Sequence, residues 1–168
     1  MTRRGRISRR KLGFGAAVVA AVPVGVSIGQ AFASASSGMQ FGSQGYFNNG
    51  QVGNRCVRAD IVDIADNTAV AAAKVADGAS CATPKEFPPG YLGARASGYR
   101  DGSFCGQTAA FYTWTTSSYI SVTSQMCSNP GGFQSFHTFA IGRFYKGPSH
   151  PDNNGYVLEG TSSPAQAY

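Results

Sequence analysis

The sequence predicts an all-β fold, arranged as a single small β-sandwich or barrel. Turn-forming residues recur along the chain at Asn49-Gly50, Asp66-Asn67, Asp77-Gly78, Asp101-Gly102, Asn129-Pro130-Gly131-Gly132 and Asn154-Gly155. The segments between these turns have the length of strands and are rich in aromatic residues, Val, Thr and Ser, which suit a half-buried pleated surface. We expect strands at 91–99, 111–115, 120–126, 133–145 and 156–159. Short strands of this kind pack as a two-layer sandwich or close into a small barrel.

One of these segments, 136–145, is apolar on both of its alternating faces. Phe136, Ala140 and Phe144 lie on one side, and Phe139, Ile141 and Tyr145 lie on the other. This pattern predicts a central strand that is covered on both faces.

The segment 57–76 has two interpretations. It is rich in alanine, which favours a helix, and Gly78 stands where a helix would stop. Against a helix, Asp66-Asn67-Thr68 is a turn signal in the middle of the segment, and Val57, Ala59 and Ile61 alternate with polar residues. We therefore expect a hairpin, with a helix within 57–76 as the alternative.

Four cysteines, Cys56, Cys81, Cys105 and Cys127, predict two disulfides, because an even number in an exported chain is typical of a disulfide framework. A zinc site would need more closely spaced ligands, so no metal is expected. Of the three pairings that four cysteines allow, we favour 56 with 81 and 105 with 127, because each pair closes one strand-turn-strand segment.

Residues 1–35 have the layout of a cleavable signal peptide. A basic block that ends at Lys11 precedes an uncharged stretch up to Phe32, and Ala31-Phe32-Ala33-Ser34-Ala35 offers two overlapping Ala-x-Ala cleavage sites. We expect cleavage after Ala35 or two residues earlier. Ser8-Arg9-Arg10-Lys11-Leu12 resembles the twin-arginine export motif, with the general secretory route as the alternative. Both routes predict a secreted, extracellular domain of residues 36–168 that has no membrane anchor once the leader is removed.

Removal of this leader changes the charge of the chain. The formal net charge is +6, but six of the fourteen basic residues lie in the leader, which leaves eight against eight acidic residues. No cluster of Lys and Arg follows Lys11 in the sequence. Because binding to phosphate backbones needs a clustered basic surface, nucleic-acid binding is not expected.

No catalytic motif organises the few histidines and acids. The sequence contains no Gly-x-Ser-x-Gly, no His-Glu-x-x-His, no phosphate loop and no glycine fingerprint, and no cofactor is expected. We interpret His137 as an ordinary histidine of a core or sheet surface, and His150 as an exposed loop residue. His137, Glu159 and Arg143 supply the residue types of an extracellular ribonuclease. They are the weak catalytic candidates, and a secreted hydrolase that uses His137 with Glu159 is one alternative function.

A binding function is predicted from the aromatic residues. Tyr112 and Trp114 are two positions apart, so they project from the same face of a strand and make a stacking platform for a sugar. The competing interpretation, which we favour for Trp114, is burial in the core, because small β domains commonly bury their tryptophan. A third interpretation is an inhibitor of an extracellular protease, with Pro88-Pro89-Gly90 or 149–154 as its rigid loop.

Several short motifs over residues 88–168 resemble those of small secreted actinobacterial proteins that have no assigned function. They are Tyr-Leu-Gly at 91–93, Tyr99-Arg100-Asp101-Gly102 before Cys105, Cys127 before a glycine turn, Gly142-Arg143-Phe144-Tyr145, Gly155-Tyr156 and Ser163-Pro164. The resemblance implies export and a Gram-positive source, and it supplies no catalytic residues.

The sequence as a whole predicts a secreted, non-catalytic binding or interaction module at the cell envelope or in the medium. The sequence leaves the partner open, with a cell-envelope glycan and an extracellular protein as the two candidates. The hydrolase and the protease inhibitor are the alternatives.

Overall fold

A computed structural model of the protein describes residues 34–62, 68–77, 80–128, 130, 132–148 and 152–167, with the backbone only at 152 and 153. Three features expected from the sequence lie outside these residues: the leader up to residue 33, the turn at Asp66-Asn67, and His150. The described part of the chain contains no helix that is long and apolar enough to cross a membrane.

The first of two antiparallel sheets is built around a long hairpin. In this hairpin, β3 (Val52–Val62) pairs with β4 (Thr68–Asp77). On the free side of β3 lie β1 (Ala35–Ser36) and β2 (Gln40–Tyr46), and on the free side of β4 lie β5 (Thr83–Pro84) and β9 (Tyr119–Gln125). The hairpin predicted for 57–76 is confirmed, and the helix alternative is wrong.

The second sheet has the same arrangement, with two long strands at its centre. There β6 (Leu92–Arg100) pairs with β10 (Ser135–Tyr145). Beside β6 lie β7 (Ser103–Gln107) and β8 (Phe111–Tyr112), and beside β10 lie β11 (Tyr156–Ser162) and β12 (Gln166–Ala167). A short 3-10 helix (Asp152–Gly155) precedes β11.

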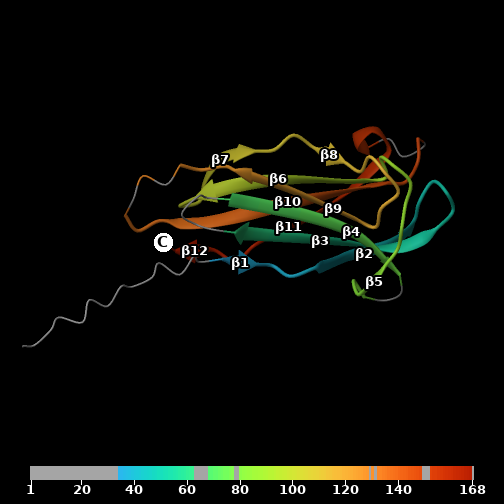
Figure 1. Cartoon of the computed structure of the whole chain (residues 1–168), viewed down its shortest axis with the longest axis horizontal. Helices are drawn as coiled ribbons and strands as arrows, with labels where there is room; N and C mark the ends of the chain where they lie inside the picture. Colours follow the sequence, from blue (N-terminus) through green and yellow to red (C-terminus); the bar gives the residue numbers. More distant parts are fainter. Residues whose placement is uncertain are drawn as a thin grey trace, which may run out of the picture. The chain divides into compact units, whose positions relative to one another are not determined.

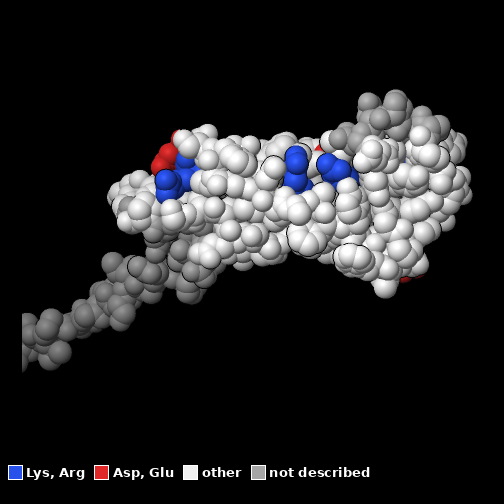
Figure 2. All heavy atoms as spheres, turned by 90° about the horizontal axis from the view of Figure 1, so that it is seen from above, with Lys and Arg blue, Asp and Glu red and all other residues white. Residues whose placement is uncertain are grey.

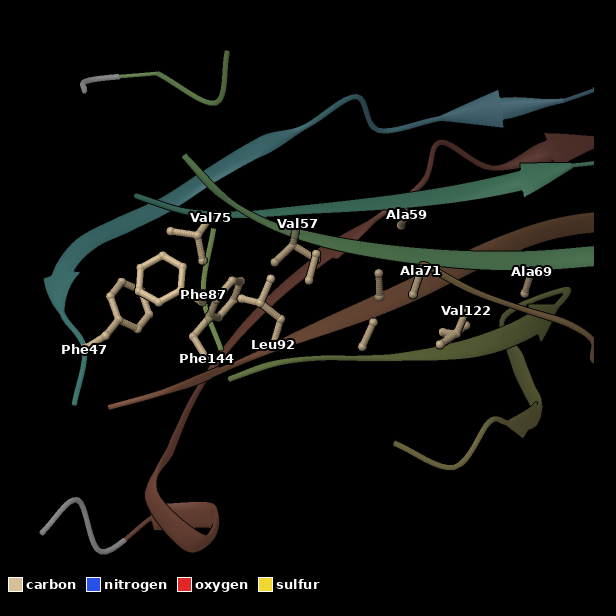
Figure 3. Packing of buried hydrophobic residues seen from close by; sticks show 14 residues of the cluster. Phe47, Val57, Ala59, Ala69, Ala71, Val75, Phe87, Leu92, Val122 and Phe144 are labelled. Atoms are coloured by element: carbon tan, nitrogen blue, oxygen red, sulfur yellow. The ribbon is translucent and has the colours of Figure 1, made fainter. Parts of the chain in front are cut away.

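The two sheets pack face to face as an open sandwich rather than a closed barrel (Figure 1). Large side chains gather toward one end of the core, where Phe47, Phe87 and Phe144 lie together, and small ones toward the other, where Ala59, Ala69 and Ala71 lie (Figure 3). The second sheet also presents alanines to the core, at positions 94, 96 and 140. The alanines of β4 therefore sit in a strand because their small side chains match a small-residue layer opposite them, and this packing overrides their helix propensity.

The strand β10 is an interior strand, as expected, but only one of its faces is fully buried. Phe136, Ala140 and Phe144 point into the core and are at most 1% exposed, whereas Phe139, Ile141 and Tyr145 are half-buried. The predicted cover on the second face is wrong, because no further layer of the described chain lies over it. We call this half-buried surface the outer face of the second sheet.

Both favoured disulfides are confirmed. Cys56 of β3 bonds to Cys81, which precedes β5, so this bridge lies within the first sheet. Cys105 of β7 bonds to Cys127, two residues beyond the end of β9, so this bridge ties the second sheet to the first. Two disulfides are consistent with an oxidising compartment.

Candidate functional site

A groove of about 640 Å³ opens at one edge of the sandwich, between β8 of the second sheet and β9 of the first. We call it the aromatic groove. Its walls are the consecutive segments 111–115 and 119–123, together with Ser117. Its volume lies within the range of about 300–1,000 Å³ that is typical of small-ligand sites.

The wall at 111–115 is formed where the chain leaves the second sheet and crosses to the first. Backbone hydrogen bonds hold both ends of the crossing. The Gly90 N–H donates to the Thr113 carbonyl over 2.7 Å, and Phe87 and Ser117 exchange two bonds of 3.0 and 2.9 Å. The Ser117 hydroxyl also accepts a bond of 3.1 Å from the Tyr119 N–H, which fixes the start of β9. The groove is therefore braced on both sides before any ligand arrives.

Trp114 lies on this wall and is 88% exposed, so the burial that we favoured for it is wrong. The reason is the length of β8, which ends at Tyr112. Trp114 thus belongs to the crossing segment rather than to a strand, and its side chain points to solvent. Phe111 (48% exposed) and Tyr119 (41% exposed) join it in the groove. The sequence does not indicate that Tyr119 lies beside Phe111 and Trp114, because nothing in it brings β9 next to β8.

Tyr112 also lines the groove, but it is half-buried and differs in its contacts. A Cβ added at Gly93 would meet the Tyr112 ring at 2.8 Å, so this ring lies over the glycine on the outer face of the second sheet. Its hydroxyl accepts a hydrogen bond of 2.9 Å from Nη1 of Arg143, and its ring centroid is 5.1 Å from that of Tyr156. The structure brings Tyr112 and Trp114 together in one groove, although not as neighbours on one strand.

The chemistry of the groove is aromatic and hydroxylic. None of the lining residues carries a charge, and the hydroxyls come from Thr113, Thr115, Thr123, Ser117 and Ser121, in addition to the two tyrosines. The Thr113 hydroxyl is buried and has no hydrogen-bond partner among the described residues. In the view of Figure 2, most of the surface is uncharged and the charged side chains form separate small groups.

The three weak catalytic candidates are not brought together. His137 lies on the outer face of the second sheet, where its ring stacks on Tyr99 with centroids 4.7 Å apart. Glu159 pairs in register with Gly142 and so faces the interior of the sandwich. Arg143 shares a face with His137, but the two are six positions apart on β10, about 20 Å along a strand. Among the described residues, no group of His, Cys, Asp and Glu could hold a metal ion.

Glu159 instead joins the two sheets at the edge opposite the groove. Its Oε1 accepts a bond of 2.7 Å from Nε of Arg55, whose side chain is 9% exposed, and a bond of 3.2 Å from the Ser43 hydroxyl. A Cβ added at Gly42 would meet the Glu159 carboxyl carbon at 2.7 Å, so β2 approaches this carboxylate closely. These contacts give Glu159 a structural role between β2, β3 and β11.

The loop at Pro88-Pro89-Gly90 is exposed at its two prolines and is tied down at Gly90. The Gly90 carbonyl accepts a hydrogen bond from the Tyr156 hydroxyl. The Gly90 N–H in turn donates to the Thr113 carbonyl. The loop therefore braces the groove wall. Most of the other loop proposed for an inhibitor, 149–154, lies outside the described residues.

Tyr156 is half-buried, and its ring packs against those of Tyr112 and Tyr145. Burial raises the pKa of its phenol above the ordinary value of 10.0, and the neighbouring Tyr112 and Tyr145 raise it further, while Arg143 acts in the opposite direction.

Comparisons with known proteins give no relative: no protein-family model, no curated protein and no solved structure matches the chain.

Proposed function

We propose that the protein is an exported, non-catalytic carbohydrate-binding module, and that the aromatic groove holds its glycan ligand. The observation that carries this proposal is the exposure of Trp114, the only tryptophan of the chain, inside an uncharged groove. Trp114 is not an isolated exposed ring: it shares the groove with Phe111 and Tyr119, and a group of exposed apolar rings marks a candidate ligand site.

The groove suits a sugar for two reasons. The faces of Trp114, Phe111 and Tyr119 offer apolar surface against which the C–H groups of a pyranose ring pack. The surrounding Ser and Thr hydroxyls and the peptide groups at the edge of β9 donate and accept hydrogen bonds, as the hydroxyls of a sugar require. An uncharged lining with this mixture suits the ring and hydroxyls of a sugar, and it offers no charged side chain of its own.

The single tryptophan provides a direct test. We expect the emission of Trp114 to shift to shorter wavelength when cell-envelope oligosaccharides are added, because a bound sugar removes water from the indole. Calorimetric titration then compares the wild type with Trp114→Ala, which we expect to bind at least tenfold more weakly, a loss of about 1.4 kcal/mol or more.

Phe133→Ala is the matched control. Phe133 is 97% exposed and is not among the residues that line the groove, so this variant removes a similar exposed ring elsewhere and should bind like the wild type. No change in Trp114 emission with any oligosaccharide of a broad panel would refute the proposal.

The export that we propose also has a specific expectation. Ala35 pairs with Ile61 in β1 and packs against a small cluster of Ile61, Cys127 and Phe136. Of the two cleavage sites, only the one after Ala33 keeps this strand whole. Mass spectrometry of protein from the culture medium should therefore find a chain that begins at Ser34 and has no free thiol. An intact chain beginning at Met1 inside the cell would contradict export.

A further inference from the structure

Two arginines lie beside each other on the outer face of the second sheet. In the register of β6 and β10, Arg95 pairs with Ile141, and Arg143 pairs with Gly93. Arg95 and Arg143 are therefore diagonal neighbours on one face, with Cα atoms about 7–8 Å apart. The sequence gives no sign of this pair, because the two residues are 48 positions apart and belong to different strands.

Neither arginine has an anionic partner among the described residues. The ion pairs of the described chain involve Arg55, Arg58 and Lys85 instead. The Nε atoms of Arg95 and Arg143 are both buried and have no hydrogen-bond partner, although Arg143 is held through Nη1 by the Tyr112 hydroxyl. A buried guanidinium N–H without an acceptor is unfavourable, and two adjacent guanidinium groups repel each other.

The sheet around this pair contains almost no negative charge. Glu159 is the only carboxylate in the six strands of the second sheet, and it points to the opposite face, where it is paired with Arg55. The mature domain is formally neutral, because its basic and acidic residues are equal in number. The outer face is positive because the acidic residues lie elsewhere in the domain, and not because the domain has more basic residues than acidic ones. A positive patch of this kind attracts anions.

Tyr112 connects the arginine pair with the aromatic groove, since it lines the groove and its hydroxyl bonds to Arg143. We infer that Arg95 and Arg143 bind an oxyanion carried by the saccharide in the groove, so that the ligand is an acidic glycan. The planar fork of arginine matches both carboxylate and phosphate groups. This inference rests on the proposed function: the groove recognises the sugar ring, and the arginine pair recognises the acidic group.

The test compares acidic oligomers of two kinds with a neutral saccharide. Trp114 emission is titrated with an oligogalacturonate, with the neutral galactose oligomer of equal length, and with a glycerol-phosphate oligomer that carries sugar substituents. We expect at least tenfold tighter binding of an acidic oligomer than of the neutral one, and a loss of this preference as salt is raised. Comparison of the oligogalacturonate with the glycerol-phosphate oligomer shows whether the bound oxyanion is a carboxylate or a phosphate.

The variant Arg95→Gln/Arg143→Gln should bind the acidic oligomer at least tenfold more weakly and the neutral oligomer about as well as the wild type. Arg100→Gln is the matched control, because it removes one positive charge from the same strand at a residue that bonds instead to Ser128. Thermal unfolding of each variant checks that it is folded.

The outcomes separate the two proposals. Equal binding of neutral and acidic oligomers, or an undiminished preference in the double variant, overturns the inference while the proposed function stands. No binding of any saccharide overturns the proposed function, and tighter binding of a plain oligonucleotide than of any saccharide overturns the glycan assignment. If the wild type and Arg100→Gln prefer the acidic oligomer and the double variant does not, the result supports both the proposed function and the inference.

Discussion

At the scale of single residues, Tyr156 shows how a polar group is held inside a cluster of rings. Its ring centroid is 5.2 Å from that of Tyr145 and 5.1 Å from that of Tyr112, and its hydroxyl donates to the Gly90 carbonyl. The neutral phenol satisfies this carbonyl, whereas a phenolate has no proton to donate and would be poorly hydrated. Burial of the phenol is the main physical reason for its raised pKa, because burial penalises the charged phenolate, and the neighbouring Tyr112 and Tyr145 raise the pKa further.

The raised pKa of Tyr156 predicts a loss of stability in alkali. Well below pH 10 the phenol is neutral in both states and its stabilising contribution is fully present. As the pH rises above 10, the unfolded chain ionises first, so the free energy of unfolding falls until the folded pKa has been passed. Urea unfolding from pH 8 to pH 11 should show this fall in the wild type.

Tyr156→Phe should be less stable by about 1 kcal/mol at pH 8, through the lost hydrogen bond, and should lose less stability above pH 10. Tyr46→Phe, which removes a phenol that is 68% exposed, is the control. An equal alkaline loss in wild type and Tyr156→Phe would contradict the prediction.

At the scale of strands, the sequence was informative where side chains alternate clearly. The strands β9, β10 and β11 lie close to their predicted positions, because aromatic and β-branched residues mark them. The strand β6 also lies close to its predicted position, 91–99, which has a tyrosine at each end. The strands β2 and β7 were not predicted, since QFGSQGY and SFCGQ consist largely of Gly, Ser and Gln. They pair with β3 and β6, and this pairing rather than intrinsic propensity makes them strands.

Only the part of the candidate site that lies within residues 112–114 could be predicted from the sequence. Tyr112 and Trp114 were found because two aromatic residues stand close together in the sequence. The place of Tyr119 in this groove and that of Arg95 beside Arg143 could not be predicted, because both arise from contacts between strands. The exposure of Trp114 could not be predicted either, since it depends on β8 ending at Tyr112 so that the chain can cross between the sheets.

At the scale of the whole domain, the two long edges of the sandwich are held differently. At one edge, Glu159 links β11 to β2 and β3 through Arg55 and Ser43. At the other, the Cys105–Cys127 disulfide joins β7 to the end of β9, and the aromatic groove opens beside the start of β9. The candidate site therefore lies at the edge that the Cys105–Cys127 disulfide holds together. This bond limits how far the two sheets can separate there.

This difference predicts distinct effects for the two disulfides. They close loops of similar length, with sequence separations of 25 and 22 residues, so removing either by a Cys→Ser pair should lower the free energy of unfolding by about 3.5 kcal/mol in the chain-entropy model. Urea unfolding measures this loss. Only the Cys105→Ser/Cys127→Ser variant removes the disulfide between the end of β9 and the second sheet, so only this variant should also bind the proposed glycan more weakly when titrated well below its unfolding temperature. Cys56→Ser/Cys81→Ser, which removes a bridge within the first sheet, is the matched control and should keep the affinity of the wild type. Equal affinities of the two variants would show that the Cys105–Cys127 bond stabilises the fold without shaping the groove.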